Sequence, residues 1–198
     1  SDAMYDAMRQ ALSSGLLFVC AAGNESNDND GFYQAYPASY DLDNILAVAA
    51  SDPTDALASF SNWGATSVDL AAPGYNIVST VPGGGYDSYS GTSMAAPHVA
   101  GAAALLKSFY PTATALDLKE ALMDGVDVVA GLQGLTVTGG RVNLVNSEAI
   151  LAAKAVISCY RGNGVFGGLL FDLAESELGA GASGLNGSAP TASRNTIT

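Results

Sequence analysis

One stretch decides the fold: Gly91-Thr92-Ser93-Met94-Ala95-Ala96-Pro97-His98-Val99-Ala100-Gly101, which continues into Ala102-Ala103-Ala104-Leu105-Leu106. Ser93 lies between a Gly-Thr pair and a run of strong helix formers, so the pattern predicts a sharp turn at the start of a helix. The first turn of a helix leaves backbone N–H groups unpaired and carries the positive end of the helix dipole, which favours an oxyanion beside Ser93. Read alone, the stretch also fits a buried small-residue helix capped by serine.

The same string resembles the nucleophile motif of the subtilisin-like serine endopeptidases, the subtilases of peptidase S8 type. Two other segments resemble this family in the expected order: Ala21-Ala22-Gly23-Asn24-Glu25, and Ser59-Phe60-Ser61-Asn62-Trp63-Gly64 with Val68-Asp69-Leu70-Ala71-Ala72-Pro73-Gly74. The resemblance covers about residues 1 to 153. It implies an α/β, three-layer subtilisin-like fold with a mostly parallel central sheet, of which this chain is the carboxyl-terminal portion only.

Length and composition fit one domain followed by a tail. The 198 residues are 48% hydrophobic, which suits a globular domain with one substantial core. We expect the subtilisin-like part to span residues 1–155. Residues 156–198 are rich in Gly, Ser and Ala, and we expect a flexible tail there, apart from a short apolar helix near Leu169 to Leu178.

The charge balance disfavours some partners. A net charge of −12 with only seven basic residues argues against nucleic acid and against an anionic membrane surface. The sequence shows neither a run of about eighteen apolar residues nor a basic-then-apolar leader, so we expect no membrane span and no signal peptide. The chain does not start with Met, and its first residues already have the pattern of a helix. We therefore expect it to be a piece of a longer protein. The resemblance favours a secreted or extracellular one.

The periodicity of apolar residues predicts alternating helices and strands. A three- and four-residue spacing predicts a helix over 2–14 closed by Gly15, and continuous apolar runs predict strands buried in a parallel sheet. The expected strands are 16–22, 45–50 and 68–72, followed by a hairpin of 77–81 and 86–90. One expected helix runs from Ser93 to about Tyr110, and a second covers 115–123 with Thr114 as its cap. A third, which follows Leu144, is expected to end at about Lys154.

The two cysteines, Cys20 and Cys159, are not expected to form a disulfide. Cys20 lies in an apolar run that reads as a buried strand, and Cys159 lies beyond the last expected helix, so they make no disulfide framework.

Asn24 follows the first expected strand, at the carboxyl edge of the sheet where ligands of such folds bind. From the residues alone it is a turn residue that ends the strand. The subtilase resemblance makes it the oxyanion-hole asparagine, whose amide donates alongside the backbone N–H of Ser93. The same resemblance places Ala22, Gly23 and Pro37 in substrate binding, with Pro37 as a cis proline at the wall of the specificity pocket.

Asp69 lies inside an expected apolar strand, where a lone carboxylate is costly unless it is paired, hydrogen-bonded or bound to a cation. The resemblance implies a structural calcium ion or another cation, held by Asp69 and by backbone carbonyls of Ala38, Tyr40 and Ile45. The alternative is a hydrogen-bonded structural aspartate. No cofactor is required for the chemistry.

A serine nucleophile needs a histidine base, and the chain has a single histidine, His98. His98 lies five residues after Ser93 on the same helix, which turns it roughly 140° around the axis and out of reach of Ser93. In subtilases the Asp and His motifs precede the first strand seen here. We therefore expect the carboxyl-terminal half of an endopeptidase that cleaves proteins or peptides through an acyl-enzyme on Ser93.

The expected partner is the upstream half of the same catalytic domain, without which the chain is predicted to be inactive. The alternative is a non-catalytic, subtilase-derived binding or scaffold module.

Overall fold

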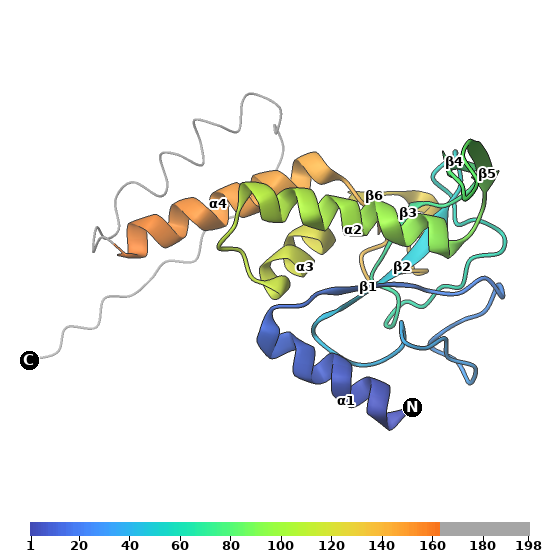
Figure 1. The fold of residues 1–198 in the computed structure, drawn as a ribbon, viewed down its shortest axis with the longest axis horizontal. Helices are drawn as coiled ribbons and strands as arrows, with labels where there is room; N and C mark the ends of the chain where they lie inside the picture. Colours follow the sequence, from blue (N-terminus) through green and yellow to red (C-terminus); the bar gives the residue numbers. More distant parts are fainter. Residues whose placement is uncertain (163–198) are drawn as a thin grey trace, which may run out of the picture. The chain divides into compact units, whose positions relative to one another are not determined.

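The computed structural model describes residues 1–162, with side-chain surroundings through residue 157 (Figure 1). The expected tail from residue 163 on, with the helix near Leu169 to Leu178, lies outside the described residues. The elements are α1 Asp2–Ala11, β1 Phe18–Ala21, β2 Ile45–Ser51, β3 Leu70–Pro73, β4 Ile77–Thr80, β5 Tyr86–Tyr89, α2 Thr92–Phe109, α3 Ala115–Asp124, β6 Asp127–Val128, β7 Gly140–Arg141 and α4 Leu144–Gly162, with 3-10 turns at Leu12–Ser14 and Ala130–Leu132.

The main sheet has the strand order β1-β2-β3-β7-β6. The pairs β1 with β2, β2 with β3 and β3 with β7 are parallel, and β6 is antiparallel to β7. The strands β4 and β5 form a separate antiparallel hairpin. The prediction of a mostly parallel sheet with one hairpin is confirmed.

The central strand β2 is buried along its whole length and packs on both faces. Leu46 and Val48 belong to the core that contains buried residues of α2 and α3, whereas Ile45 and Ala47 pack with Met8 of α1. Figure 1 shows α2 and α1 on opposite sides of β1 and β2. Alternate side chains of one strand therefore bind two helical layers, and the predicted three-layer arrangement is confirmed.

Several element boundaries differ from those expected, and two of them bear on other predictions. Strand β3 begins at Leu70, so Asp69 precedes the strand instead of lying inside it. Helix α4 continues to Gly162, beyond the expected end near Lys154 and into the segment assigned to the tail from residue 156. The segment between Lys154 and Gly162 contains neither glycine nor proline, so nothing in it stops the helix.

Cys20 is a free, buried thiol in β1. Burial raises its pKa to about 11, with Asp69 adding a smaller effect of the same sign, so the thiol is protonated at neutral pH. The side chain of Cys159 lies outside the described residues, and the absence of a bond between the two stays a prediction. None of the helices within residues 1–162 is long and apolar enough to cross a membrane.

Helix α3 begins with a capping box, which gives a test of the fold. The Thr114 hydroxyl accepts from the N–H of Asp117 at 3.1 Å, and the Asp117 carboxylate accepts from the N–H of Thr114 at 2.9 Å. Thr114→Ala removes the cap and should lower the free energy of unfolding by about 1 kcal/mol in urea denaturation. Thr112→Ala, at an exposed position two residues earlier, should leave it unchanged, and equal losses in both variants would contradict the capping role.

Candidate active site

Ser93 is the second residue of α2, and its side chain is exposed at the open end of that helix. The carbonyl of Gly91 accepts from the N–H of Met94 at 2.9 Å and from that of Ala95 at 3.3 Å, which closes the first turn. Helix geometry supplies no partner for the N–H of Ser93 itself. The hydroxyl and a hydrogen-bond donor are thus presented together at the positive end of the helix.

The side chain of Asn24 is fixed to the residue before Ser93. Its Oδ1 accepts from the backbone N–H of Thr92 at 2.8 Å and from the Thr92 hydroxyl at 3.0 Å. Because a carboxamide has its oxygen and nitrogen on opposite branches, this pair of bonds directs the amide nitrogen away from Thr92. Beside it, Gly91 has no side chain, and a Cβ there would stand 3.6 Å from the Asn24 nitrogen.

Thr92 is a site residue that the sequence analysis missed. It is fully buried, and its hydroxyl donates to Asn24 while accepting from the N–H of Gly23 at 3.2 Å. The loop after β1 is thereby tied to the start of α2. The available signal was a polar, β-branched side chain immediately before the candidate nucleophile.

The residues expected to bind substrate surround this loop. Ala22 is fully buried, and its carbonyl accepts from the side-chain amides of Asn29 at 2.9 Å and Asn62 at 3.1 Å. The Tyr36–Pro37 peptide bond is cis, as the subtilase resemblance implies.

A cavity of about 500 Å³ opens next to Asn24, between the end of β1 and the segment before Pro37. Its lining residues are Glu25, Asn27, Tyr33, Gln34, Ala35 and Asn62. Ala22, Gly23 and Pro37, which were expected to bind substrate, are not among these lining residues. Glu25 is the one charged side chain of the six.

His98 is exposed on α2, and its Nδ1 lies 2.9 Å from the carbonyl oxygen of Met94 on the same helix. The ring is thus hydrogen-bonded to its own helix, which agrees with the expectation that it does not serve Ser93.

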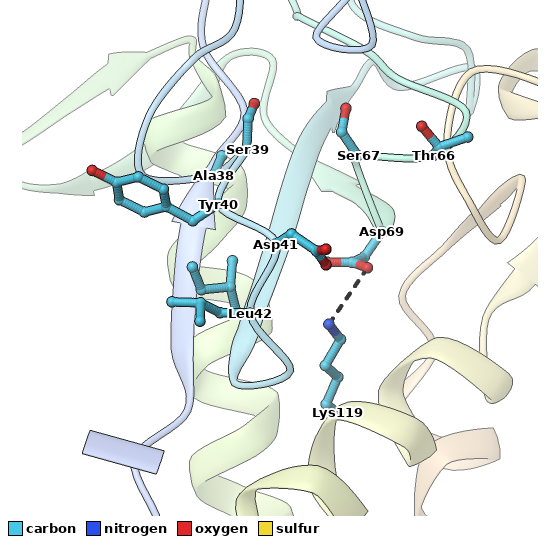
Figure 2. Close-up of a pocket in the computed structure, with 10 residues that line it drawn as sticks. Ala38, Ser39, Tyr40, Asp41, Leu42, Thr66, Ser67, Asp69 and Lys119 are labelled. Atoms are coloured by element: carbon cyan, nitrogen blue, oxygen red, sulfur yellow. Dashed lines mark ion pairs between the residues drawn. The ribbon is translucent and has the colours of Figure 1, made fainter. Parts of the chain in front are cut away.

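The four residues expected to hold a cation meet at one cavity of about 410 Å³ (Figure 2). Ala38, Tyr40, Ile45 and Asp69 all line it, together with Lys119 of α3. The Asp69 Oδ2 accepts from the N–H of Ala47 at 2.7 Å, and its Oδ1 lies 3.8 Å from the Lys119 ammonium. Figure 2 shows these two side chains pointing toward each other.

Of the oxygen ligands expected for a cation at this cavity, one is the carboxylate of Asp69 and the others are backbone carbonyls. Calcium takes six to eight oxygen ligands, and within residues 1–162 no group of three or more His, Cys, Asp or Glu side chains is placed to hold a metal. Burial raises the pKa of Asp69, while the Lys119 ammonium and the Ala47 N–H oppose that rise. Asp69 is thus hydrogen-bonded to the Ala47 N–H and has Lys119 as a nearby counter-charge, and the cation stays a prediction.

The sequence was compared with protein families and with curated proteins. The family model of Peptidase_S8, described as the subtilase family, matches residues 1–146. Alkaline elastase YaB of Bacillus sp. (strain YaB) is 43% identical over 149 residues, which are 75% of this chain and 36% of the elastase. Subtilisin E of Bacillus subtilis (strain 168) is 44% identical over 122 residues, which are 62% of this chain and 31% of the subtilisin. The chain thus spans about a third of the length of these relatives.

Solved structures give the same result. The prenylagaramide maturation protease PagA superposes with a TM-score of 0.68 at 28% identity, over 76% of this chain and 56% of that one. A protease from Pseudoalteromonas arctica PAMC 21717 superposes with a TM-score of 0.66 at 30% identity, over 75% and 47% of the two chains. The family match covers most of the described residues and includes both Asn24 and Ser93, and this chain belongs to the subtilase family.

Proposed function

We propose that this chain is the carboxyl-terminal half of a serine endopeptidase domain. In this proposal Ser93 is the nucleophile, Asn24 donates to the oxyanion, and the histidine base with its aspartate comes from an upstream half. The substrates are proteins or peptides, and the place of action is outside the cell, which the subtilase resemblance favours. The observation that carries the proposal is the fixed amide of Asn24 beside Ser93.

The chemistry follows from these positions. The Ser93 oxygen attacks the carbonyl carbon of the scissile peptide bond, and its proton passes to the imidazole supplied by the upstream half. Negative charge develops on the carbonyl oxygen, and in this proposal the Asn24 amide and the Ser93 N–H donate to it. The C–N bond then breaks, the amine leaves with the proton, and water hydrolyses the acyl-enzyme.

The exposed side of α2 supports a missing half. This helix is apolar on nearly all sides, and a helix of that kind is normally buried all round. Here only one face packs on the sheet, and Leu105 and Phe109 remain 42% and 64% exposed. A Cβ at Gly101 would meet no atom within 4 Å in the part of the chain that the structure describes, so nothing there requires a glycine in mid-helix.

The edge of the sheet supports the same conclusion. Among residues 1–162, strand β1 lies at the edge of the sheet and pairs with β2 alone. An edge strand leaves a row of backbone N–H and C=O groups to which another strand can add. An upstream half that adds a parallel strand beside β1 and covers α2 would complete both surfaces.

A second candidate is a non-catalytic, subtilase-derived binding or scaffold module. The single histidine favours it, because His98 is bonded to its own helix and no other imidazole exists in the chain. The DNA sequence in frame ahead of Ser1 separates the two, since only the protease requires Asp and His motifs there.

The first test is covalent labelling of Ser93 with a fluorophosphonate probe. The chain alone should label poorly, because nothing deprotonates Ser93, and addition of the upstream half, in cis or as a separate fragment, should restore labelling. Ser93→Ala should abolish the restored labelling, whereas Ser88→Ala, on the exposed strand β5, should keep it. Strong labelling of the chain alone would mean that an unrecognised base exists within it.

The oxyanion role of Asn24 predicts a specific kinetic change. In the complete domain, Asn24→Ala should lower kcat by roughly 10² to 10³ and leave KM nearly unchanged, because the amide binds the developing oxyanion more than the substrate. Steady-state hydrolysis of a peptide substrate measures both constants. A loss confined to KM would assign Asn24 to substrate binding instead.

For the cation we propose that Lys119 is the resident counter-charge of Asp69, and that a metal ion gains access when this ammonium is removed. Lys119→Met should lower the free energy of unfolding by about 2 kcal/mol at pH 7. Because folding raises the pKa of Asp69, the protonated carboxyl favours the folded state. This contribution to the free energy of unfolding is complete below the unfolded pKa of about 3.9 and is lost as the pH rises through the pKa in the folded state. The loss in Lys119→Met should therefore be largest at pH 7 and small near pH 4.

Calcium should restore part of the lost melting temperature in this variant, and a chelator should remove the gain. Arg9→Met, which breaks the exposed pair of Arg9 with Asp6, is the control and should cost well under 1 kcal/mol at either pH. If calcium and chelator leave the melting curves of Lys119→Met unchanged, the cation proposal is wrong.

A further inference from the structure

The segment Ser59–Gly64 has no role in the mechanism so far, yet it contains a buried amide that contacts the loop carrying Asn24. Asn62 is 1% exposed and lies 38 positions after Asn24 in the sequence. Its backbone N–H donates to the carbonyl of Gly23 at 2.9 Å. The main chain of this segment therefore lies directly against the loop after β1.

The side chain of Asn62 binds this loop at both of its polar atoms. Its Oδ1 accepts from the N–H of Glu25 at 2.8 Å and from that of Asn27 at 3.1 Å. Since backbone N–H groups can only donate, these two bonds fix which branch of the amide is oxygen.

The nitrogen branch faces three acceptors. Nδ2 lies 3.1 Å from the Ala22 carbonyl, 3.0 Å from the Glu25 carboxylate and 3.2 Å from the Asn29 amide oxygen. The Glu25 carboxylate in turn accepts from the N–H of Asn24 at 2.9 Å. One buried side chain thus holds the backbone on both sides of Asn24, and through Glu25 it reaches the N–H of Asn24 itself.

The side chain of Asn62 packs closely against the backbone of Gly23. Gly23 has φ +112°, and a Cβ there would stand 2.3 Å from the Asn62 nitrogen. Such a contact is too short for any real side chain, so a glycine is required where Asn62 approaches.

We propose that Asn62 is a positioning residue that fixes the direction of the Asn24 amide. Thr92 holds the oxygen of the Asn24 side chain, and Asn62 holds the backbone from which that side chain starts. With both ends held, the amide nitrogen has one direction, toward the oxyanion. This inference rests on the proposed function of Asn24, whereas the hydrogen bonds of Asn62 to the loop do not depend on it.

The test uses Asn62→Asp in the complete domain, because the carboxylate keeps the two acceptor bonds and loses every donor bond. It also places a second negative charge beside Glu25. We expect kcat to fall roughly 10- to 100-fold, with a smaller change in KM, because a small displacement of a catalytic donor is costly. In the Asn24→Ala background the same substitution should leave kcat unchanged, since Asn62 acts through Asn24.

A rescue variant separates positioning from general damage. Adding Glu25→Gln to Asn62→Asp removes the repulsion between the two adjacent carboxylates, so part of the lost kcat should return. The matched control is Asn44→Asp, which alters another fully buried asparagine whose amide holds the carbonyls of Met8 and Leu16. This control should lower the melting temperature and leave kcat unchanged.

Hydrogen exchange gives a readout that needs no turnover. Asn62→Asp should speed exchange at the amides of Asn24, Glu25 and Asn27 at least tenfold, and Asn44→Asp should not. If the wild-type domain cleaves no peptide, the proposed function fails, and these exchange rates decide the role of Asn62 alone. Unchanged exchange at the three amides, or an equal loss of kcat in the Asn24→Ala background, would overturn the inference.

Discussion

The site depends on the hydrogen bonds of Thr92 to the loop that follows β1. Thr92 can hold Gly23 and Asn24 only because α2 packs along the sheet, with Val99 and Leu106 buried against the same core as Leu46. The position of the Asn24 side chain is therefore a consequence of helix packing as much as of local sequence. A helix with a bulkier buried face would sit farther from the sheet and separate Thr92 from Asn24.

Much of this architecture could be predicted from the sequence because it depends on local pattern. The continuous apolar run at Ile45 predicts a strand buried on both faces, and the Ala-rich run after Ser93 predicts a helix, whatever the rest of the chain does. The roles of Thr92 and Asn62 could not be predicted from the residues themselves. Their partners lie far away in the sequence, and a buried Thr or Asn looks like any turn residue until its neighbour is known.

Asp69 illustrates the same limit for electrostatics. The sequence shows an isolated carboxylate in apolar surroundings, and it indicates correctly that the charge needs compensation. It does not show that Lys119, fifty positions later and on α3, supplies an ammonium at the same cavity. A charge that compensates a buried carboxylate can thus come from a residue far away in the sequence.

The one-sided burial of α2 has a consequence for the time at which activity arises. In the proposed domain the base is synthesised first and the nucleophile last, on a helix whose second face has no cover until the upstream half packs on it. A ribosome-bound chain would therefore hold an incomplete catalytic centre until this half had emerged and folded. In the proposed domain, hydrolysis would begin only after the two parts of the sheet have joined.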